Sequence, residues 1–345
     1  MPPTPRRLSG VISVVAAGAL FLGGGTLGLL LGAHLGRTVE VGSISPPAPG
    51  GASTDTTELI RTTGYRFISP LIECERSRIG QLTFVESKLN DVIRRVKEQK
   101  TAEHVSIYVR ELNNGPWLGI GERAVFSPAS LLKVPLMMTV LRLAERDPQV
   151  LSVRLTCPDE EEQWRPNIRG SREIVPGETY SVDELVDQMI VHSDNRAANL
   201  LLRSLNESDL VQTYQELGLP LPPLDGKRHE MTVRQYAGTF RILYNAMFLS
   251  RAASEDALER LSRTEFRDGI VAGIPDGTPV AHKFGERGLE TGLVQLHDCG
   301  IVYAPQLPYL ICVMTQGRSF EELRGVVELI SRTTYVSLTE HAAKH

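Results

Sequence analysis

Apolar residues recur three and four positions apart in two stretches of the chain, at 85–96 and 323–330. This spacing places them on one face of a helix, so each stretch predicts an amphipathic helix. Ser319 and Glu322 form an S-x-x-E capping pattern ahead of the second stretch, which we expect to cover a sheet. The residues that carry the two patterns are Val85, Leu89, Val92, Ile93 and Val96, and Leu323, Val326, Val327 and Ile330.

Alternating apolar and polar residues predict strands early and late in the chain. In HVSIYVREL, Val105, Ile107 and Val109 share one face, and an Asn-Asn-Gly turn at 113–115 leads into a second strand, PWLGIGERAVF. Strand patterns return as PVAHKFG, GLVQLHDCGIVYA and LPYLICVMTQG, and the last two form a hairpin around 305–308. The segment YRFISPLIECE also has the composition of an entering strand.

The region from about 148 to 250 lies between the early and late strands and is mostly helical in pattern. Ser181 and Glu184 form a capping box ahead of VDELVDQMIVH, and a Ser-Asp-Asn triplet at 193–195 separates this helix from RAANLLLRSL. The order of elements therefore predicts an α/β fold with an inserted helical lobe.

An uncharged run from Val11 to Leu35 is long enough to span a bilayer. Arg6 and Arg7 precede it and few positive charges follow it closely, so we expect the chain beyond the run to lie outside the cytoplasm. A cleaved signal peptide is the alternative, but it has a shorter apolar core and a small-residue cleavage site that is not evident here. The expected segments are a cytoplasmic tail at 1–10, a single transmembrane anchor in the cell membrane at 11–36, and a flexible linker rich in Pro, Gly, Ser and Thr at 37–58.

Composition removes several classes of function. The chain has 345 residues, 41% of them hydrophobic, which fits a globular fold with a sizeable core. Its net charge of -4 and the lack of a basic block with interleaved aromatic residues give no indication of a nucleic-acid partner. His229 and Glu230 lack the second histidine of a zinc-protease motif, and we expect neither a metal nor a cofactor. The four cysteines, Cys74, Cys157, Cys299 and Cys312, lack C-x-x-C spacing, and disulfides between them stay possible.

Ser130 and Lys133 lie one helical turn apart in FSPASLLKVP. Ser127 at the N-cap and Pro128 at the first helical position predict that a helix begins here. Ser130 would then lie in the first turn, where its backbone N–H has no intrahelical partner and can stabilise an oxyanion. A serine hydroxyl is a weak nucleophile until a base takes its proton, and a partly desolvated lysine three residues on can be that base.

Two further motifs follow in chain order: S-D-N at 193–195 on a helical corner, and K-F-G at 283–285 on a strand. Together with S-x-x-K at 130–133, they resemble the class A β-lactamase and penicillin-binding protein superfamily, over about residues 100–335. The resemblance implies an antiparallel sheet flanked by helices, with an inserted all-α lobe, in a catalytic domain at 59–342.

The resemblance also implies a role for each matching residue. Ser130 would be the acylated nucleophile, and Lys133 would accept its proton. Ser193 would relay a proton to the leaving nitrogen, and Lys283 would supply positive charge near Ser193 and the substrate carboxylate. Asn195 would hydrogen-bond the amide of the substrate's side chain.

The third motif and the residue after it would complete the substrate-binding site. Gly285 and Glu286 belong to this strand, and the backbone N–H groups of Ser130 and Glu286 would form the oxyanion hole. Asp194 is expected to tie the helical corner together, as an aspartate in a turn does without any catalysis.

Two departures from the superfamily pattern affect the expected chemistry. Phe284 stands where a hydroxyl residue usually follows the lysine, so a donor for a substrate carboxylate is missing. Class A β-lactamases carry a glutamate and an asparagine before a T-x-R-like segment, to activate the deacylating water. Met231-Thr232-Val233-Arg234 resembles that segment, but LGLPLPPLDGKRHE before it has no such pair. Glu230 is the nearest carboxylate and is a candidate for deacylation, the alternative being a charge that flanks a helix start.

We therefore expect a membrane-anchored, extracytoplasmic serine hydrolase that opens a β-lactam, or a D-Ala-type amide of a peptidoglycan stem peptide, through an acyl-enzyme at Ser130. One alternative is a D,D-peptidase or penicillin-binding protein that deacylates slowly. The other is a catalytically silent protein that binds a cell-wall peptide, which Phe284 favours and the retained serines and lysines disfavour. His282, His297 and Asp298 are interpreted as locally satisfied and receive no role.

Overall fold

The computed structural model of the protein describes residues 65–68, 82–113, 115–159, 168, 170–222 and 229–342. The expected cytoplasmic tail, membrane anchor and linker lie outside these ranges. Within the ranges, none of the helices is long and apolar enough to cross a membrane.

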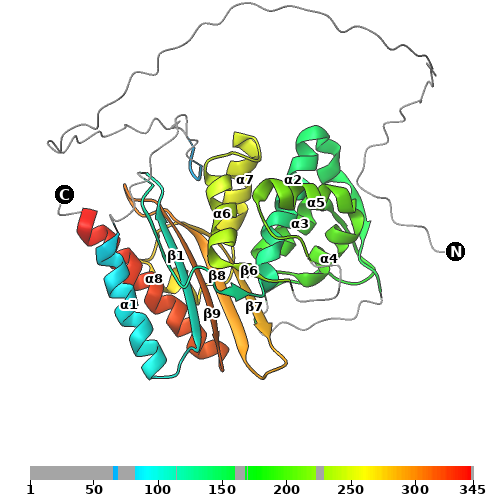
Figure 1. Ribbon diagram of the computed structural model, residues 1–345. Coiled ribbons are helices and arrows are strands. Elements are labelled where there is room, and N and C mark those ends of the chain that lie inside the picture. The colour runs from blue at the N-terminus through cyan, green and yellow to red at the C-terminus, as the bar shows by residue number, and fades with distance from the viewer. Residues whose placement is uncertain are drawn as a thin grey trace, which may run out of the picture. The chain divides into compact units, whose positions relative to one another are not determined.

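A five-stranded antiparallel sheet organises the described residues, with helices on both of its faces (Figure 1). The strand order is β2-β1-β9-β8-β7. These strands are β1 (His104–Glu111), β2 (Trp117–Ile120), β7 (Val280–Gly288), β8 (Val294–Val302) and β9 (Tyr309–Gly317). The expected α/β fold with an antiparallel sheet flanked by helices is confirmed, and the β8–β9 hairpin lies where the sequence predicted it.

One face of the sheet is covered by α1 (Thr83–Glu98) and α8 (Phe320–Ala342), which pack side by side (Figure 1). The apolar residues that predicted α1 are all buried, as are the four that predicted the start of α8. The backbone N–H of Glu322 donates to Ser319 Oγ at 3.4 Å, so the expected cap of α8 is present.

The other face supports the helical lobe. Its helices are α2 (Lys133–Arg146), α3 (Val182–Val191), α4 (Asn195–Ser204), α5 (Glu207–Leu217), α6 (Val233–Tyr244) and α7 (Arg251–Ser262). The capping box of Ser181 and Glu184 begins α3, as expected. The lobe is wider than the predicted range of 148–250, because α2 and α7 share its core.

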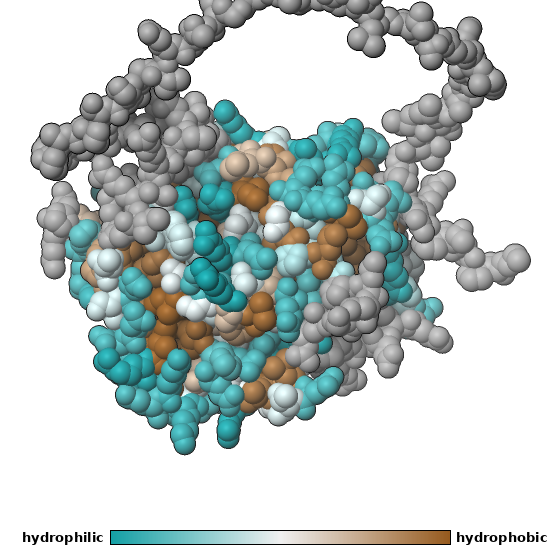
Figure 2. All heavy atoms as spheres, in the orientation of Figure 1, coloured by the Kyte–Doolittle hydropathy of each residue, from teal (hydrophilic) through white to brown (hydrophobic). Residues whose placement is uncertain are grey.

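The sheet is buried on both sides, which explains why LPYLICVMTQG reads as one apolar run. Along β9, Ile311 and Val313 face the α1–α8 core, whereas Leu310, Cys312 and Met314 face the core of the lobe. Figure 2 shows that hydrophobic and hydrophilic residues alternate in small patches over the visible face.

The second strand predicted near the start of the chain is divided. β2 pairs with β1, but the chain then turns at Gly121, which has a φ of +60° and lies close to the Val105 carbonyl. The remaining residues form β3 (Val125–Phe126), which pairs with β6 (Met231–Thr232) outside the main sheet. A glycine in the left-handed region can end a strand that the apolar pattern would otherwise continue.

The entering strand predicted in YRFISPLIECE is absent from its described part, residues 65–68. The backbone N–H groups of Arg66, Phe67 and Ile68 donate to the carboxylate of Glu255 on α7, at 2.7 to 3.0 Å. The Glu255 carboxylate thus accepts the hydrogen bonds that these backbone N–H groups would otherwise donate to a neighbouring strand.

Short elements complete the described structure. They are the 3₁₀ helices η1 (Ala129–Leu132), η2 (Pro148–Ser152) and η3 (Val271–Gly273), and the paired strands β4 (Arg154–Thr156) and β5 (Thr179–Ser181).

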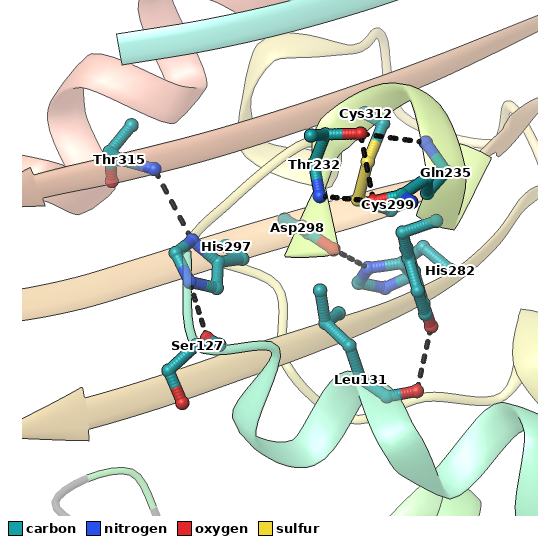
Figure 3. Close-up of a disulfide and its surroundings, with 11 residues drawn as sticks. Ser127, Leu131, Thr232, Gln235, His282, His297, Asp298, Cys299, Cys312 and Thr315 are labelled. Carbon is teal, nitrogen blue, oxygen red and sulfur yellow. Dashed lines mark hydrogen bonds and ion pairs between the residues drawn. A yellow bond between two sulfur atoms is a disulfide. The ribbon is translucent and has the colours of Figure 1, made fainter. Parts of the chain in front are cut away.

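A disulfide joins Cys299 on β8 to Cys312 on β9, which are direct partners in the strand register. Figure 3 shows this bond together with the polar residues of β8 that lie near it. Cys157 is a free, buried thiol. The spacing of the cysteines left this pairing undetermined, because the β8–β9 register decides it.

Candidate active site

A cleft of about 730 Å³ lies between the lobe and the β7 edge of the sheet. Ser130, Lys133, Ser193, Asn195 and Glu286 all line it. They come from the start of α2, the α3–α4 corner and β7, so the fold brings together the three motifs that are far apart in the sequence.

The segment that carries Ser130 is the 3₁₀ turn η1, and the expected α-helix, α2, begins only at Lys133. Pro128 is at the N-cap position of η1, and no side chain caps it. Ser127 is therefore not the N-cap, contrary to the prediction, because its hydroxyl accepts a hydrogen bond from Arg287 at 3.1 Å. Ala129 has a φ of +49°, a left-handed conformation that costs energy for a residue other than glycine. This turn places Ser130 in the cleft, with Lys133 one turn later.

Lys133 is 6% exposed, and its amine contacts three oxygen atoms. Its Nζ donates to the Ser193 carbonyl, to Ser193 Oγ at 3.2 Å and to Asn195 Oδ1 at 2.7 Å. Burial lowers the pKa of Lys133 to about 7, although the carboxylates of Asp194 and Glu286 act in the opposite direction. A large fraction of Lys133 is thus neutral near pH 7 and able to accept a proton.

Lys283 is fully buried, and its Nζ donates to Ser193 Oγ at 2.9 Å and to the Phe284 carbonyl at 3.1 Å. Burial and the nearby Lys133 lower its pKa well below the usual value for lysine. Asp298 and Glu286 partly oppose this shift. Two amines therefore share one serine hydroxyl, and their mutual repulsion favours a state in which one of them is neutral.

The corner that carries Ser193 is fixed by its neighbour Asp194. The Asp194 carboxylate accepts from the backbone N–H groups of Arg196, Ala197 and Ile174, at 2.7, 3.3 and 2.6 Å respectively. It caps α4 and joins the helix to the preceding loop, as expected for this residue. Ser193 itself has a φ of +57°, a second strained position next to a polar group of the cleft.

Gly285 allows β7 to pass directly against η1. A Cβ atom at this position would lie 2.8 Å from the Pro128 carbonyl oxygen and 3.2 Å from the Leu131 nitrogen. Tyr236 holds the same turn from the lobe, because its hydroxyl donates to the Leu131 carbonyl at 2.9 Å. The close approach brings the backbones of Ser130 and Glu286 to the same part of the cleft, as the expected oxyanion hole requires.

A set of polar side chains from β7 and β8 holds Ser127, three residues before Ser130. Ser127 N donates to Gln295 Oε1 at 3.1 Å, Arg287 donates to Ser127 Oγ, and His297 Nε2 lies 3.0 Å from the Ser127 carbonyl oxygen. We call Gln295, His297 and Arg287 the Ser127 clamp. The pattern that identified the motifs missed it, although Gln295 and His297 are polar and two apart in an apolar strand.

The hydrogen bonds of His297 define its tautomer (Figure 3). The backbone N–H of Thr315 donates to His297 Nδ1 at 3.3 Å, so Nδ1 carries no proton. Nε2 must then carry one, which it donates to the Ser127 carbonyl. Complete burial lowers the pKa of His297 to about 4, so the ring stays neutral at physiological pH.

His282 and Asp298 form a buried pair with 2.8 Å between Nδ1 and Oδ1 (Figure 3). The other Asp298 oxygen accepts from the backbone N–H of Ile270 at 2.9 Å. Asp298 is thus satisfied locally, as interpreted, whereas His282 Nε2 is buried with no hydrogen-bond partner among the described residues. Asp298 also acts on the cleft indirectly, because its charge raises the pKa of Lys283.

Phe284 turns away from the cleft. Its ring stacks on Phe266 with 4.3 Å between centroids, and it packs in the core between the sheet and the α1–α8 pair. The position after Lys283 thus contributes packing rather than a hydrogen-bond donor.

Glu230 is exposed, precedes β6 and is not among the described residues that line the cleft. The cleft wall beyond Lys133 and Asn195 includes Leu136, Leu210 and Tyr214 instead. The geometry therefore gives Glu230 no support as a group that activates water.

Comparison with known proteins agrees with this arrangement. The family model described as the beta-lactamase enzyme family matches residues 85–338. The chain belongs to this family. A curated beta-lactamase from Streptomyces lavendulae is 25% identical over 258 residues, which cover 68% of this chain and 82% of that protein.

Solved structures share the fold of this family member. A mutant of PBP-A, solved as an acyl-enzyme complex with penicillin G, has a TM-score of 0.62 and 24% identity, covering 77% of this chain and all of that one. The TLA-1 extended-spectrum beta-lactamase has a TM-score of 0.63 and 18% identity, covering 74% of this chain and 99% of that one. At these identities, the similarity shows the fold alone.

Proposed function

We propose that the protein is a serine hydrolase that forms an acyl-enzyme at Ser130 and releases it slowly, as expected of a D,D-peptidase or penicillin-binding protein. The observation that carries this proposal is the Ser193 hydroxyl, which lies within hydrogen-bond distance of both Lys133 and Lys283. This hydroxyl connects Lys133, whose pKa is lowered, to the second buried amine, that of Lys283.

Acylation follows from these groups in two steps. Neutral Lys133 takes the proton of Ser130 Oγ as that oxygen attacks the carbonyl carbon of the scissile amide, and the carbonyl oxygen becomes an oxyanion. The backbone N–H groups of Ser130 and Glu286 are the proposed donors to it. The proton on Lys133 then passes through the Ser193 hydroxyl to the amide nitrogen. The carbon–nitrogen bond breaks, and an ester to Ser130 remains.

Deacylation requires a base for a water molecule, and the carboxylates that line the described part of the cleft have partners in the protein. Glu286 accepts a hydrogen bond from the backbone N–H of Ile168 at 2.9 Å. Asp194 is committed to the backbone of the α3–α4 corner, and Glu173 lies 4.0 Å from Arg196. Leu136, Leu210 and Tyr214 make the nearby wall largely apolar. These features support slow hydrolysis of the ester, with Lys133 as the remaining base.

A silent peptide-binding protein is the second candidate, and the position of Phe284 favours it because the cleft lacks a donor there. The environment of Lys133 is the counter-argument. A buried lysine with a pKa near neutrality costs folding energy, which binding alone does not require.

We also propose that the chain is anchored in the cell membrane by residues 11–36, with its catalytic domain outside the cytoplasm, near peptidoglycan. The sequence pattern supports the anchor. The disulfide between Cys299 and Cys312 supports the compartment, because such bonds persist mainly in oxidising surroundings.

Intact mass spectrometry of the full-length chain with a large excess of benzylpenicillin tests the acyl-enzyme. We expect a mass increase of one penicillin, mapped by proteolysis to Ser130, and its loss in Ser130→Ala. Lys133→Ala should slow the adduct by about two orders of magnitude or more, the usual contribution of a general base. An adduct that persists in Ser130→Ala, or maps elsewhere, would contradict the proposal.

A further inference from the structure

Arg287 is an exposed arginine that lines the cleft from β7, and it uses little of its hydrogen-bonding capacity within the protein. Its Nη1 donates to Ser127 Oγ at 3.1 Å, which leaves most of the guanidinium donors uncommitted to described residues. Among these residues no carboxylate is in ion-pair contact with Arg287. The carboxylate of its neighbour Glu286 instead accepts from the backbone N–H of Ile168 at 2.9 Å.

The other cationic side chains that line the described part of the cleft are held by protein partners. Arg196 donates to a backbone carbonyl at 3.1 Å, and His192 Nδ1 lies 3.0 Å from a carboxylate oxygen of Glu265. Lys133 is buried, and its amine is bound to the α3–α4 corner. In these ranges, Arg287 is therefore the cation of the cleft that can take up an anion without losing a carboxylate partner.

The contact with Ser127 orients the guanidinium before any ligand binds. Ser127 is 2% exposed and is held in turn by Gln295 and His297. An arginine that is already fixed at one edge loses less conformational entropy on binding, and its planar fork matches the two oxygens of a carboxylate. Arg287 thus has the features of a preformed carboxylate site.

The order of residues along β7 indicates which part of a substrate reaches Arg287. Lys283 donates to Ser193 Oγ, the proposed proton donor to the leaving nitrogen, so the leaving group lies toward the Lys283 end of the strand. The backbone N–H of Glu286 is a proposed donor to the oxyanion. Arg287 comes after it, about 13 Å along the strand from Lys283 and on the same face. It therefore lies on the acyl side of the scissile bond.

We propose that Arg287 binds an anionic group on the acyl part of the substrate, the part that stays on Ser130 as the ester. The favoured substrate is an acyl donor whose side chain carries a carboxylate, such as a peptide with an acidic residue before the scissile amide. This inference rests on the proposed acyl-enzyme and names the substrate class of the same site. A carboxylate on the leaving group lies toward the other end of β7 and is not affected.

Benzylpenicillin and its α-carboxy derivative, carbenicillin, provide a matched pair of probes, because they differ only by a carboxylate on the acyl side chain. The second-order rate constant for adduct formation is measured for each by intact mass with the full-length chain. We expect carbenicillin to acylate the wild type about tenfold faster, because hydrogen bonds between charged groups are stronger than neutral ones.

Arg287→Gln tests the residue itself. Both rates should fall, since Arg287 also belongs to the Ser127 clamp, but the carbenicillin rate should fall further, so that the ratio of the two rates approaches one. Arg287→Lys keeps the charge without the fork and should retain part of the preference. Arg196→Gln is the matched control, because it removes another arginine of the cleft, and it should leave the ratio unchanged.

Ionic strength tests the charge in the wild type, without any substitution. Because Arg287 is exposed, salt should screen its attraction for the added carboxylate. Raising the ionic strength from about 0.05 M to about 0.5 M should therefore reduce the preference for carbenicillin severalfold.

Three results would overturn the inference. Equal rates with the two probes in the wild type, or a faster reaction of benzylpenicillin, would show that the added carboxylate is not recognised. An unchanged ratio in Arg287→Gln would show that another group recognises it. Both results leave the acyl-enzyme intact, whereas no adduct at Ser130 with either probe would contradict the proposed function and this inference with it.

Discussion

Lys133 is buried in the cleft that Ser130 also lines, and its amine is hydrogen-bonded to Ser193 and Asn195. Its protonation state should therefore control acylation. Only the neutral amine can accept the Ser130 proton, and the pKa of Lys133 is lowered to about 7. The acylation rate should therefore rise about tenfold per pH unit below pH 7 and level off above it. Rates with the neutral methyl ester of benzylpenicillin, from pH 5 to 9, check this. A midpoint near 10, the usual range of an exposed lysine, would contradict it.

The same shift affects stability. Between about pH 7 and 10.5 the unfolded chain keeps the Lys133 proton that the native protein releases. The free energy of unfolding contributed by this residue should thus increase with pH across that window. Urea unfolding of the wild type and Lys133→Met at pH 6 and pH 9 measures it, and the stability gained by the substitution should be larger at pH 6.

Gly285 is the residue at which a single added methyl group should disturb the site most selectively. In Gly285→Ala the new Cβ would lie 2.8 Å from the Pro128 carbonyl oxygen, which forces β7 and η1 apart. We expect a loss of about 1–3 kcal/mol in unfolding free energy and slower acylation. Gly288→Ala is the matched control in the same strand, because a Cβ there meets no atom within 4 Å. Similar effects of the two substitutions would contradict the proposed close packing.

At the scale of elements, the Ser127 clamp should position the turn that carries Ser130. His297→Phe keeps the size of the ring but removes its bonds to Ser127 and Thr315, whereas His297→Gln retains a donor and an acceptor. The maximal acylation rate should fall about tenfold in the first variant and recover partly in the second, with little change in the dissociation constant of the probe. Stopped-flow acylation separates the two quantities. Equal losses in both variants would contradict the positioning role.

Which elements the sequence could predict depends on how local their causes are. α1 and α8 follow from apolar spacing, and the caps of α3 and α8 need only residues three apart, so both kinds of feature were predictable. The cap at Ser127 was wrong because Arg287, far along the chain, takes its hydroxyl. The sequence predicts β2 and β3 as one strand, because the apolar pattern gives no sign of the left-handed turn at Gly121 that separates them. The motifs located the candidate site. The contacts of Gln295 and His297 with Ser127 could not be predicted, because they depend on the register of β8.

At the scale of the whole molecule, the disulfide links β8 to the central strand β9 under the lobe. Cys299 and Cys312 are 13 residues apart in sequence, so their bond should contribute about 3 kcal/mol by restricting the unfolded chain. The double substitution to alanine should lower the urea midpoint by a matching amount. Reductant should destabilise the wild type and leave the double variant unchanged, and an equal effect on both would contradict this assignment.

The central proposal is an ester at Ser130 that forms through Lys133 and then persists. The most direct measurement loads the full-length chain with benzylpenicillin, removes free drug, and follows the intact mass over several hours. We expect an adduct on Ser130 that decays slowly, with Ser130→Ala unlabelled throughout. Rapid return to the unmodified mass with release of hydrolysed drug would contradict slow deacylation, and no adduct at any drug concentration would contradict the acyl-enzyme itself.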